Sequence, residues 1–257
     1  MQHREPIFNV PGVVLWLLAA MFAVHLLRWL LSPAEGLWLT QAMAFVPGRL
    51  VGCARELPGG QVAIVSAFIT HLFVHGDLTH LLINSAWLLA FGTPVARRID
   101  TARFLAFFFL CGIAGALLYV AVRVAGGDPL IPVVGASGAI SGLMGAAFRF
   151  LFRGIERSKG LRDIGSVPLM SLKETLRDRR VLLTAAVWTA LNGLQAWGAV
   201  GLTAAAGIAW EAHLGGFYAG LLLYGLFEPC TNRGGPGSNP GSSPGSSPGL
   251  DDAADAC

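Results

Sequence analysis

Between Arg103 and Arg123 the chain reads FLAFFFLCGIAGALLYVAV, residues 104–122, without a single charge. About 20 apolar residues in an α-helix are enough to cross the hydrocarbon core of a membrane. The whole 257-residue chain has the same character, because 54% of its residues are hydrophobic and only 13% are charged. Soluble domains carry about 25% charged residues. This composition excludes a disordered protein, a nucleic-acid-binding arm and an ordinary cytosolic enzyme, and it predicts a chain that lies mostly in a lipid bilayer.

Similar long gaps between charges occur along the rest of the chain, and they predict an all-α, polytopic membrane protein with six transmembrane helices. The stretch 181–227 is too long for one helix, and small residues after Gly198 predict a turn within it. The six predicted spans are 13–31, 78–96, 104–122, 129–148, 181–198 and 205–227. Two further apolar segments are expected outside these spans: an interfacial or re-entrant element at 36–48 and a lead-in to the second span at 57–76.

The distribution of basic residues predicts the orientation. With six spans and a cytoplasmic N-terminus, fourteen of the eighteen Lys and Arg residues lie inside and four lie outside. A seventh span at 57–76 would reverse this bias, so the positive-inside rule favours six spans with both termini in the cytoplasm. A cleaved signal peptide is the other interpretation of the first span, but no clear A-x-A site follows it. We expect a multi-pass protein of the bacterial inner membrane.

The last 26 residues differ from the rest of the chain. Residues 232–257 are rich in Gly, Pro and Ser and end in an acidic run, a composition that cannot bury a core. The sequence therefore predicts a membrane domain at 1–231 and a flexible cytoplasmic tail at 232–257. The four cysteines have no CxxC spacing, so neither a metal knuckle nor a disulfide framework is indicated.

Polar residues inside membrane spans are costly, so each one is a candidate functional group. His80 and Asn84 open the second span on one helix face, Ser137 opens the fourth, and His213 lies near the start of the sixth. The even-numbered spans all begin at the outer surface, so these side chains share one depth. A serine becomes a nucleophile when a histidine takes its proton, and a helix N-terminus offers N–H groups to an oxyanion. Acyl transfer by a Ser137–His213 dyad fits this inventory.

Small residues line the two helices that would carry this dyad. Gly216 and Gly220 form a GxxxG face beside His213, and Gly138 and Gly142 follow Ser137 at the same spacing. Glycines at this spacing allow two helix backbones to approach closely. We therefore expect these four glycines to be helix-packing residues that bring Ser137 and His213 together.

On these motifs the sequence resembles the rhomboid family of intramembrane serine proteases over about residues 10–228. The resemblance implies a six-helix rhomboid-like bundle with an interfacial first outer loop, and a Ser137–His213 dyad that needs no cofactor or metal. It also implies an oxyanion hole made by the Ser137 N–H, Asn84 and His80, and a cavity lined by His71 and His75. The implied partners are transmembrane-helix substrates and the lipid bilayer, not nucleic acid.

The sequence departs from the family at one position beside the site. Many members carry an aromatic residue four positions after the serine, where it packs on the base, and here that position is Ser141. Another group must then hold His213. Glu211 is expected to face away from His213, because two residues along a helix rotate by about 200°; it is expected at the outer boundary, against water or headgroups. Asn192 is expected to make an interhelical hydrogen bond.

Other functions remain to be weighed. A catalytically silent relative that binds membrane helices is one, although both dyad residues are present. A transporter would be expected to show an internal repeat, which we do not find. His71, His75 and His80 could be metal ligands by spacing, but only Asp77 lies near enough in sequence to complete such a set. The sequence does not define the natural substrate or the oligomeric state.

Overall fold

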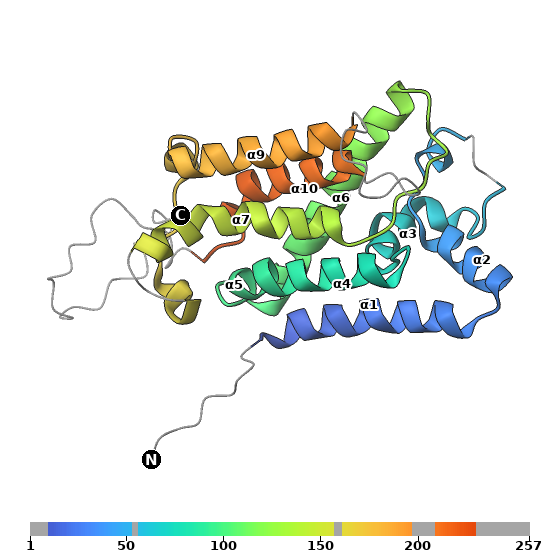
Figure 1. The fold of residues 1–257 in the computed structure, drawn as a ribbon, viewed down its shortest axis with the longest axis horizontal. Coiled ribbons are helices and arrows are strands. Elements are labelled where there is room, and N and C mark those ends of the chain that lie inside the picture. Colours follow the sequence, from blue (N-terminus) through green and yellow to red (C-terminus); the bar gives the residue numbers. More distant parts are fainter. Residues whose placement is uncertain (1–9, 53–55, 157–160, 197–208, 230–257) are drawn as a thin grey trace, which may run out of the picture.

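The computed structural model describes residues 10–52, 56–156, 161–196 and 209–229, and Figure 1 shows their arrangement as a bundle of long helices lying side by side. Within these ranges the secondary structure is helical, with one isolated β-bridge and no strand. The long helical segments are α1 (Gly12–Leu30), α4 (Leu78–Trp87) continued by η3 (Leu88–Gly92) and α5 (Thr93–Ala96), α6 (Thr101–Ala125), α7 (Ser137–Glu156), α9 (Arg179–Ala196) and α10 (Trp210–Leu223).

Shorter elements connect the long segments. Between α1 and α4 lie α2 (Pro33–Met43), η1 (Pro47–Arg49), α3 (Val62–Thr70) and η2 (His71–Phe73), and later in the chain come η4 (Leu161–Ser166), α8 (Leu172–Thr175) and η5 (Tyr224–Leu226). In Figure 1, α2 and α3 gather at one end of the bundle, at the right, where α1 ends and α4 begins. Three segments, Gly12–Leu30, Leu78–Ala96 and Thr101–Ala125, are long and apolar enough to cross a membrane on length and composition alone. The chain is a helical multi-pass membrane protein, as predicted.

The fourth span differs from its prediction. We expected it at 129–148, but α7 begins at Ser137 and continues to Glu156. Pro129 and Pro132 disfavour a helix in the preceding segment. The backbone there is instead held by two hydrogen bonds between Phe45 and Val133, at 3.0 and 2.8 Å. The prediction was wrong because an uncharged run was read as a helix although prolines interrupt it.

The lead-in predicted at 57–76 is also corrected. Residues 62–73 form the separate elements α3 and η2, and a fresh helix start follows. The Asp77 carboxylate accepts a hydrogen bond from the His80 backbone N–H at 2.8 Å and caps α4 there. The segment predicted at 36–48 contains α2 and η1. The turn predicted after Gly198 and the tail at 232–257 lie outside the described residues.

The second span contains a π-turn, η3, at Leu88–Gly92. Pro94 lies two residues after this turn and has no backbone N–H, so the Ala90 carbonyl loses the partner it would have in an α-helix. Turns of this type widen a helix locally and occur often at functional sites. The span therefore changes its helical register between Asn84 and Thr93.

The closest packing in the molecule joins α7 and α10. A Cβ atom added at Gly216 would collide with the Gly138 carbonyl, and one added at Gly220 would collide with the Gly142 carbonyl. A Cβ atom added at Gly145 would also collide with the Phe217 carbonyl. We call this contact between α7 and α10 the glycine seam. Backbone on backbone, with no side chain between, fixes the distance between the two helices.

A buried ion pair anchors the other end of α10. Arg98, just after α5, pairs with Glu228, just after η5, and both side chains are fully buried. The Arg98 guanidinium also lies 4.4 Å from the centroid of the Phe150 ring on α7. These contacts tie three helical segments together at the end of the bundle opposite Ser137.

Candidate active site

Ser137 is the first residue of α7, and α7 begins at the end of the bundle where α2 and α3 lie (Figure 1). The first backbone N–H groups of a helix have no intrahelical partner and point towards this end, as does the positive end of the helix dipole. A serine in this place has N–H donors and a favourable field beside its hydroxyl. Both would stabilise negative charge developing next to Ser137.

His213 lies in the first turn of α10, and its Nε2 atom is 2.8 Å from Ser137 Oγ. This is a normal hydrogen-bond length between two side chains that are 76 residues apart in the chain. The glycine seam runs directly below the pair, because Gly138 and Gly216 follow the two residues. Both side chains are half-buried. The structure therefore brings together the serine and histidine selected from the sequence.

The other face of the imidazole contacts α9. His213 Nδ1 is 3.0 Å from Asn192 Oδ1, and the Trp188 ring lies 6.1 Å from the His213 ring, centroid to centroid. Asn192 and Trp188 are four residues apart and so share one face of α9. They hold His213 where the family aromatic is absent at Ser141. Asn192 makes the kind of interhelical hydrogen bond that we expected, whereas Trp188 was not among the predicted site residues.

His80 packs against the segment that leads into α7. Gly135 has a φ of +112°, a conformation that L side chains rarely adopt. A Cβ atom at Gly135 would also lie 2.8 Å from the His80 ring. The Gly135 N–H donates a hydrogen bond to the His71 carbonyl at 2.9 Å, which joins this segment to η2. Because residue 135 is a glycine, the His80 ring can pack against the backbone two positions before Ser137.

Asn84 is buried on α4, one turn after His80. Its side-chain amide donates one hydrogen bond to the His80 carbonyl at 2.9 Å. An amide nitrogen carries two hydrogens, so a second N–H remains available for another acceptor. The structure places Asn84 on the helix of His80 and gives no direct contact between Asn84 and Ser137.

His71, in η2, and His75, between η2 and α4, are both buried. His71 Nδ1 lies 2.7 Å from the Ala67 carbonyl, and the His75 ring packs edge-on against His80 at 5.1 Å. Burial lowers the pKa of His71 to about 4, and burial together with the His80 ring lowers the pKa of His75 to about 3. Both imidazoles are therefore neutral at pH 7. Among the described residues no group of three or more His, Cys, Asp or Glu side chains is placed to hold a metal ion.

Glu211 does not have the surroundings expected from the sequence. It was placed at the outer boundary against water or headgroups, but the side chain is 1% exposed and lies 2.9 Å from Arg123 Nε at the end of α6. A buried carboxylate needs such a partner, because leaving water is otherwise too costly. The pair joins α6 to α10 on the side away from the serine, so Glu211 has a structural contact.

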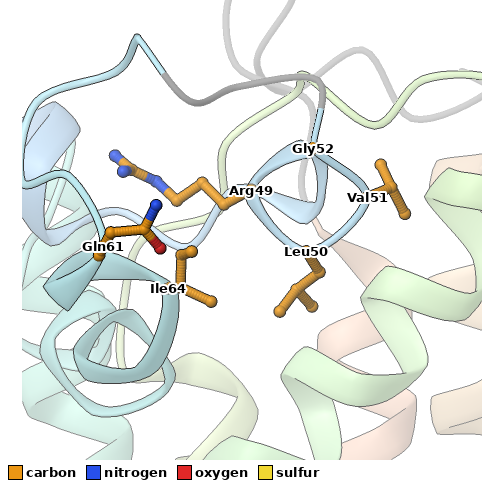
Figure 2. A pocket seen from close by; sticks show the side chains of 6 residues that line it. All are labelled: Arg49, Leu50, Val51, Gly52, Gln61 and Ile64. Atoms are coloured by element: carbon orange, nitrogen blue, oxygen red, sulfur yellow. The ribbon is translucent and has the colours of Figure 1, made fainter.

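A surface hollow of about 490 Å³ lies beside η1 and the start of α3, lined by Arg49, Leu50, Val51, Gly52, Gln61 and Ile64 (Figure 2). Arg49 Nη2 donates hydrogen bonds to the carbonyls of Gln41 and Pro58, both at 2.8 Å, and so joins the segments before and after η1. None of the dyad residues lines this hollow. Its polar contacts serve the loop's own backbone.

The match to known proteins agrees with this geometry. The family model for the rhomboid domain matches residues 63–228, which is more than half of the chain and includes every candidate residue named above. The chain belongs to the rhomboid family, a family of intramembrane proteases.

One relative is YdcA of Bacillus subtilis (strain 168), which is named provisionally as a rhomboid protease. The two sequences are 42% identical over 98 residues, a stretch that covers 35% of this chain and 46% of YdcA. The chain therefore spans about half the length of this relative.

Proposed function

We propose that this protein is an intramembrane serine endopeptidase in which Ser137 is the nucleophile and His213 the general base. The observation that carries the proposal is the 2.8 Å separation of Ser137 Oγ and His213 Nε2. In the first step Nε2 takes the hydroxyl proton while Oγ attacks the scissile carbonyl. His213 then gives that proton to the leaving amine, and water releases the acyl group by the same route in reverse.

The negative charge of the tetrahedral intermediate needs donors. We assign this role to the Ser137 backbone N–H, the remaining N–H of Asn84 and the His80 side chain. Loss of a single donor of this kind costs about 10²–10³ in kcat in a serine protease. His71 and His75, neutral and buried, line the space behind His80.

The test of the dyad is covalent labelling of the purified protein by a fluorophosphonate, together with cleavage of a membrane substrate. Ser137→Ala and His213→Ala should each abolish both signals while the protein still inserts and keeps its melting temperature within a few degrees. Cleavage at the wild-type rate by either variant contradicts the assignment. A wild-type protein that neither labels nor cleaves would instead be a silent relative that binds membrane helices.

The substrate class follows from the place of the site. The dyad lies at helix ends within a membrane protein, and peptide bonds of an α-helix are hidden in their own hydrogen bonds. The nucleophile needs an extended strand, so a transmembrane segment must unwind locally before cleavage. Gly and Pro lower that cost, by about 1 and 3 kcal/mol relative to Ala. We propose cleavage of single-pass membrane proteins near the outer boundary, with a small residue before the cleaved bond.

A model substrate whose helix-breaking residues are replaced by Leu and Ala tests this specificity. We expect it to be cut at least tenfold more slowly than the parent, with the change in kcat rather than in membrane insertion. Equal rates for the two substrates would show that local unwinding does not limit cleavage.

The orientation proposed is that of the charge bias, with both termini and the 149–180 loop in the cytoplasm of a bacterial inner membrane. In a background without native cysteines, Lys173→Cys should resist an impermeant thiol reagent added to whole cells, and Leu130→Cys should react. Both residues are exposed in the structure, so accessibility within the protein does not bias the comparison. The reverse labelling pattern would overturn the topology.

A further inference from the structure

We propose that Asn192 is a positioning residue for the proposed dyad: its side-chain oxygen holds His213 in the tautomer that can accept the Ser137 proton. This inference rests on the proposed function. It concerns a residue of α9 that the family resemblance does not assign.

The orientation of the Asn192 amide is set by a second bond. Its Nδ2 atom donates to the Trp188 carbonyl at 2.9 Å, so Oδ1 is the atom that faces His213. A flipped amide would place Oδ1 against the Trp188 carbonyl oxygen, and two acceptors would then meet. The hydrogen bond to Trp188 thus favours the amide orientation in which Oδ1 faces His213.

An amide oxygen can only accept a hydrogen bond, which decides the proton position on the imidazole. His213 Nδ1 must carry the hydrogen to bond Asn192 Oδ1 at 3.0 Å. In neutral imidazole the other nitrogen then has the free lone pair. That nitrogen is Nε2, 2.8 Å from Ser137 Oγ, so the resting histidine is ready to act as a base.

Water cannot easily substitute for Asn192. The Asn192 side chain is 1% exposed, and its two polar atoms bond the Trp188 carbonyl and the His213 ring. Burial of an amide is unfavourable unless it is hydrogen-bonded, and here both ends of the amide have partners. Its neighbours Leu191 and Gly193 are exposed, so the inward-turned polar residue is an exception on this part of α9.

Asn192→Leu removes the acceptor at similar volume, and Asn192→Asp keeps an acceptor and adds charge. We expect Asn192→Leu to lower kcat at least tenfold with KM within twofold. It should also move the acid limb of the pH–rate profile to lower pH, because the imidazolium loses a partner. Asn192→Asp should recover most of kcat and move that limb to higher pH, because a carboxylate stabilises the imidazolium. If Asn192 only packs, its substitution should change the melting temperature and leave the acid limb of the pH–rate profile unchanged in both variants.

Thr189→Val is the matched control. Thr189 also joins α9 to α10, through a hydrogen bond to Tyr218 at 2.7 Å, but it does not touch His213. We expect its kcat and pH profile to match the wild type. An equal loss of kcat in Thr189→Val would mean that any α9–α10 bond has this effect, and the proposal would fail.

The tautomer itself can be read without activity, from the imidazole nitrogen shifts of ¹⁵N-histidine-labelled protein. The wild type should show His213 protonated at Nδ1, and Asn192→Leu should show a mixture or the opposite form. An Nε2-protonated wild type overturns the proposal. If the wild type is Nδ1-protonated but neither cleaves nor labels, the proposed function has failed and the positioning role stands.

Discussion

The two helices that hold His213 from opposite sides contact α10 in different ways. On the α7 side, the glycine seam brings backbone against backbone, and Gly216 and Gly220 leave no room for a methyl group. On the α9 side, contact is made by side chains, and Leu183, Val187 and Leu191 are exposed along the outer face of the helix. The distance from nucleophile to base is therefore set by rigid backbone, whereas the orientation of the base depends on a helix held more loosely.

The largest difference should appear when one methyl group is added either at the contact between α7 and α10 or on α9. Gly220→Ala must push α7 and α10 apart, and we expect it to lower the free energy of unfolding by about 3 kcal/mol, at the upper end for overpacking, and to abolish cleavage. Gly193→Ala, on α9, meets open space and should be neutral or stabilising by up to about 1 kcal/mol. Denaturant unfolding in detergent micelles measures both. Equal destabilisation of the two variants would erase the proposed difference between the helices.

A smaller effect should follow from breaking the tie between α10 and α6. Glu211→Gln leaves Arg123 beside a neutral side chain, and we expect a loss of about 1–3 kcal/mol because the carboxylate is buried while Arg123 is partly exposed. The exposed pair of Arg103 and Asp100 supplies the comparison. Arg103→Ala should cost less than about 1 kcal/mol in the same unfolding assay. A larger loss from Arg103→Ala would mean that burial does not rank these contacts.

The smallest effect should come from the Gly-, Pro- and Ser-rich tail. Deletion of 232–257 should leave kcat/KM within twofold, because its composition cannot form a core and the family match ends at residue 228. Cleavage of the same substrate by the truncated chain measures this. A tenfold loss of kcat/KM would mean that the tail takes part in catalysis, in addition to the contacts of α7 and α9 with α10.

Much of the fold was predictable because membrane spans leave a simple one-dimensional signal. Uncharged stretches located the spans that became α1, α4 with α5, α6 and α9, and the family assignment is confirmed. The fourth span was misplaced because hydropathy does not register that Pro129 and Pro132 break a helix. Glu211 was misjudged because a sequence does not show that Arg123, 88 positions earlier, meets it.

The candidate site divides along the same line. Ser137, His213, His80 and Asn84 could be selected because polar groups in apolar spans are rare and their depths could be compared. Trp188 could not, because an aromatic residue in a membrane helix is ordinary until its neighbour is known. Its contact with His213 depends on the rotation of α9, which pairwise spacing along the chain does not give.

The π-turn at Leu88–Gly92 has a consequence for how the second span can change in length. A π-turn accommodates one residue more than the α-turn it replaces, and one residue corresponds to about 100° of helix rotation. Removal of a single residue here would restore an ordinary α-helix and keep the segment continuous. It would leave His80 and Asn84 facing nearly as they do now relative to Val95, because the wider turn already takes up the rotation that an extra residue adds to a regular α-helix. The span thus contains a one-residue insertion that the wider turn absorbs, so the half that carries His80 and Asn84 keeps its facing towards α7.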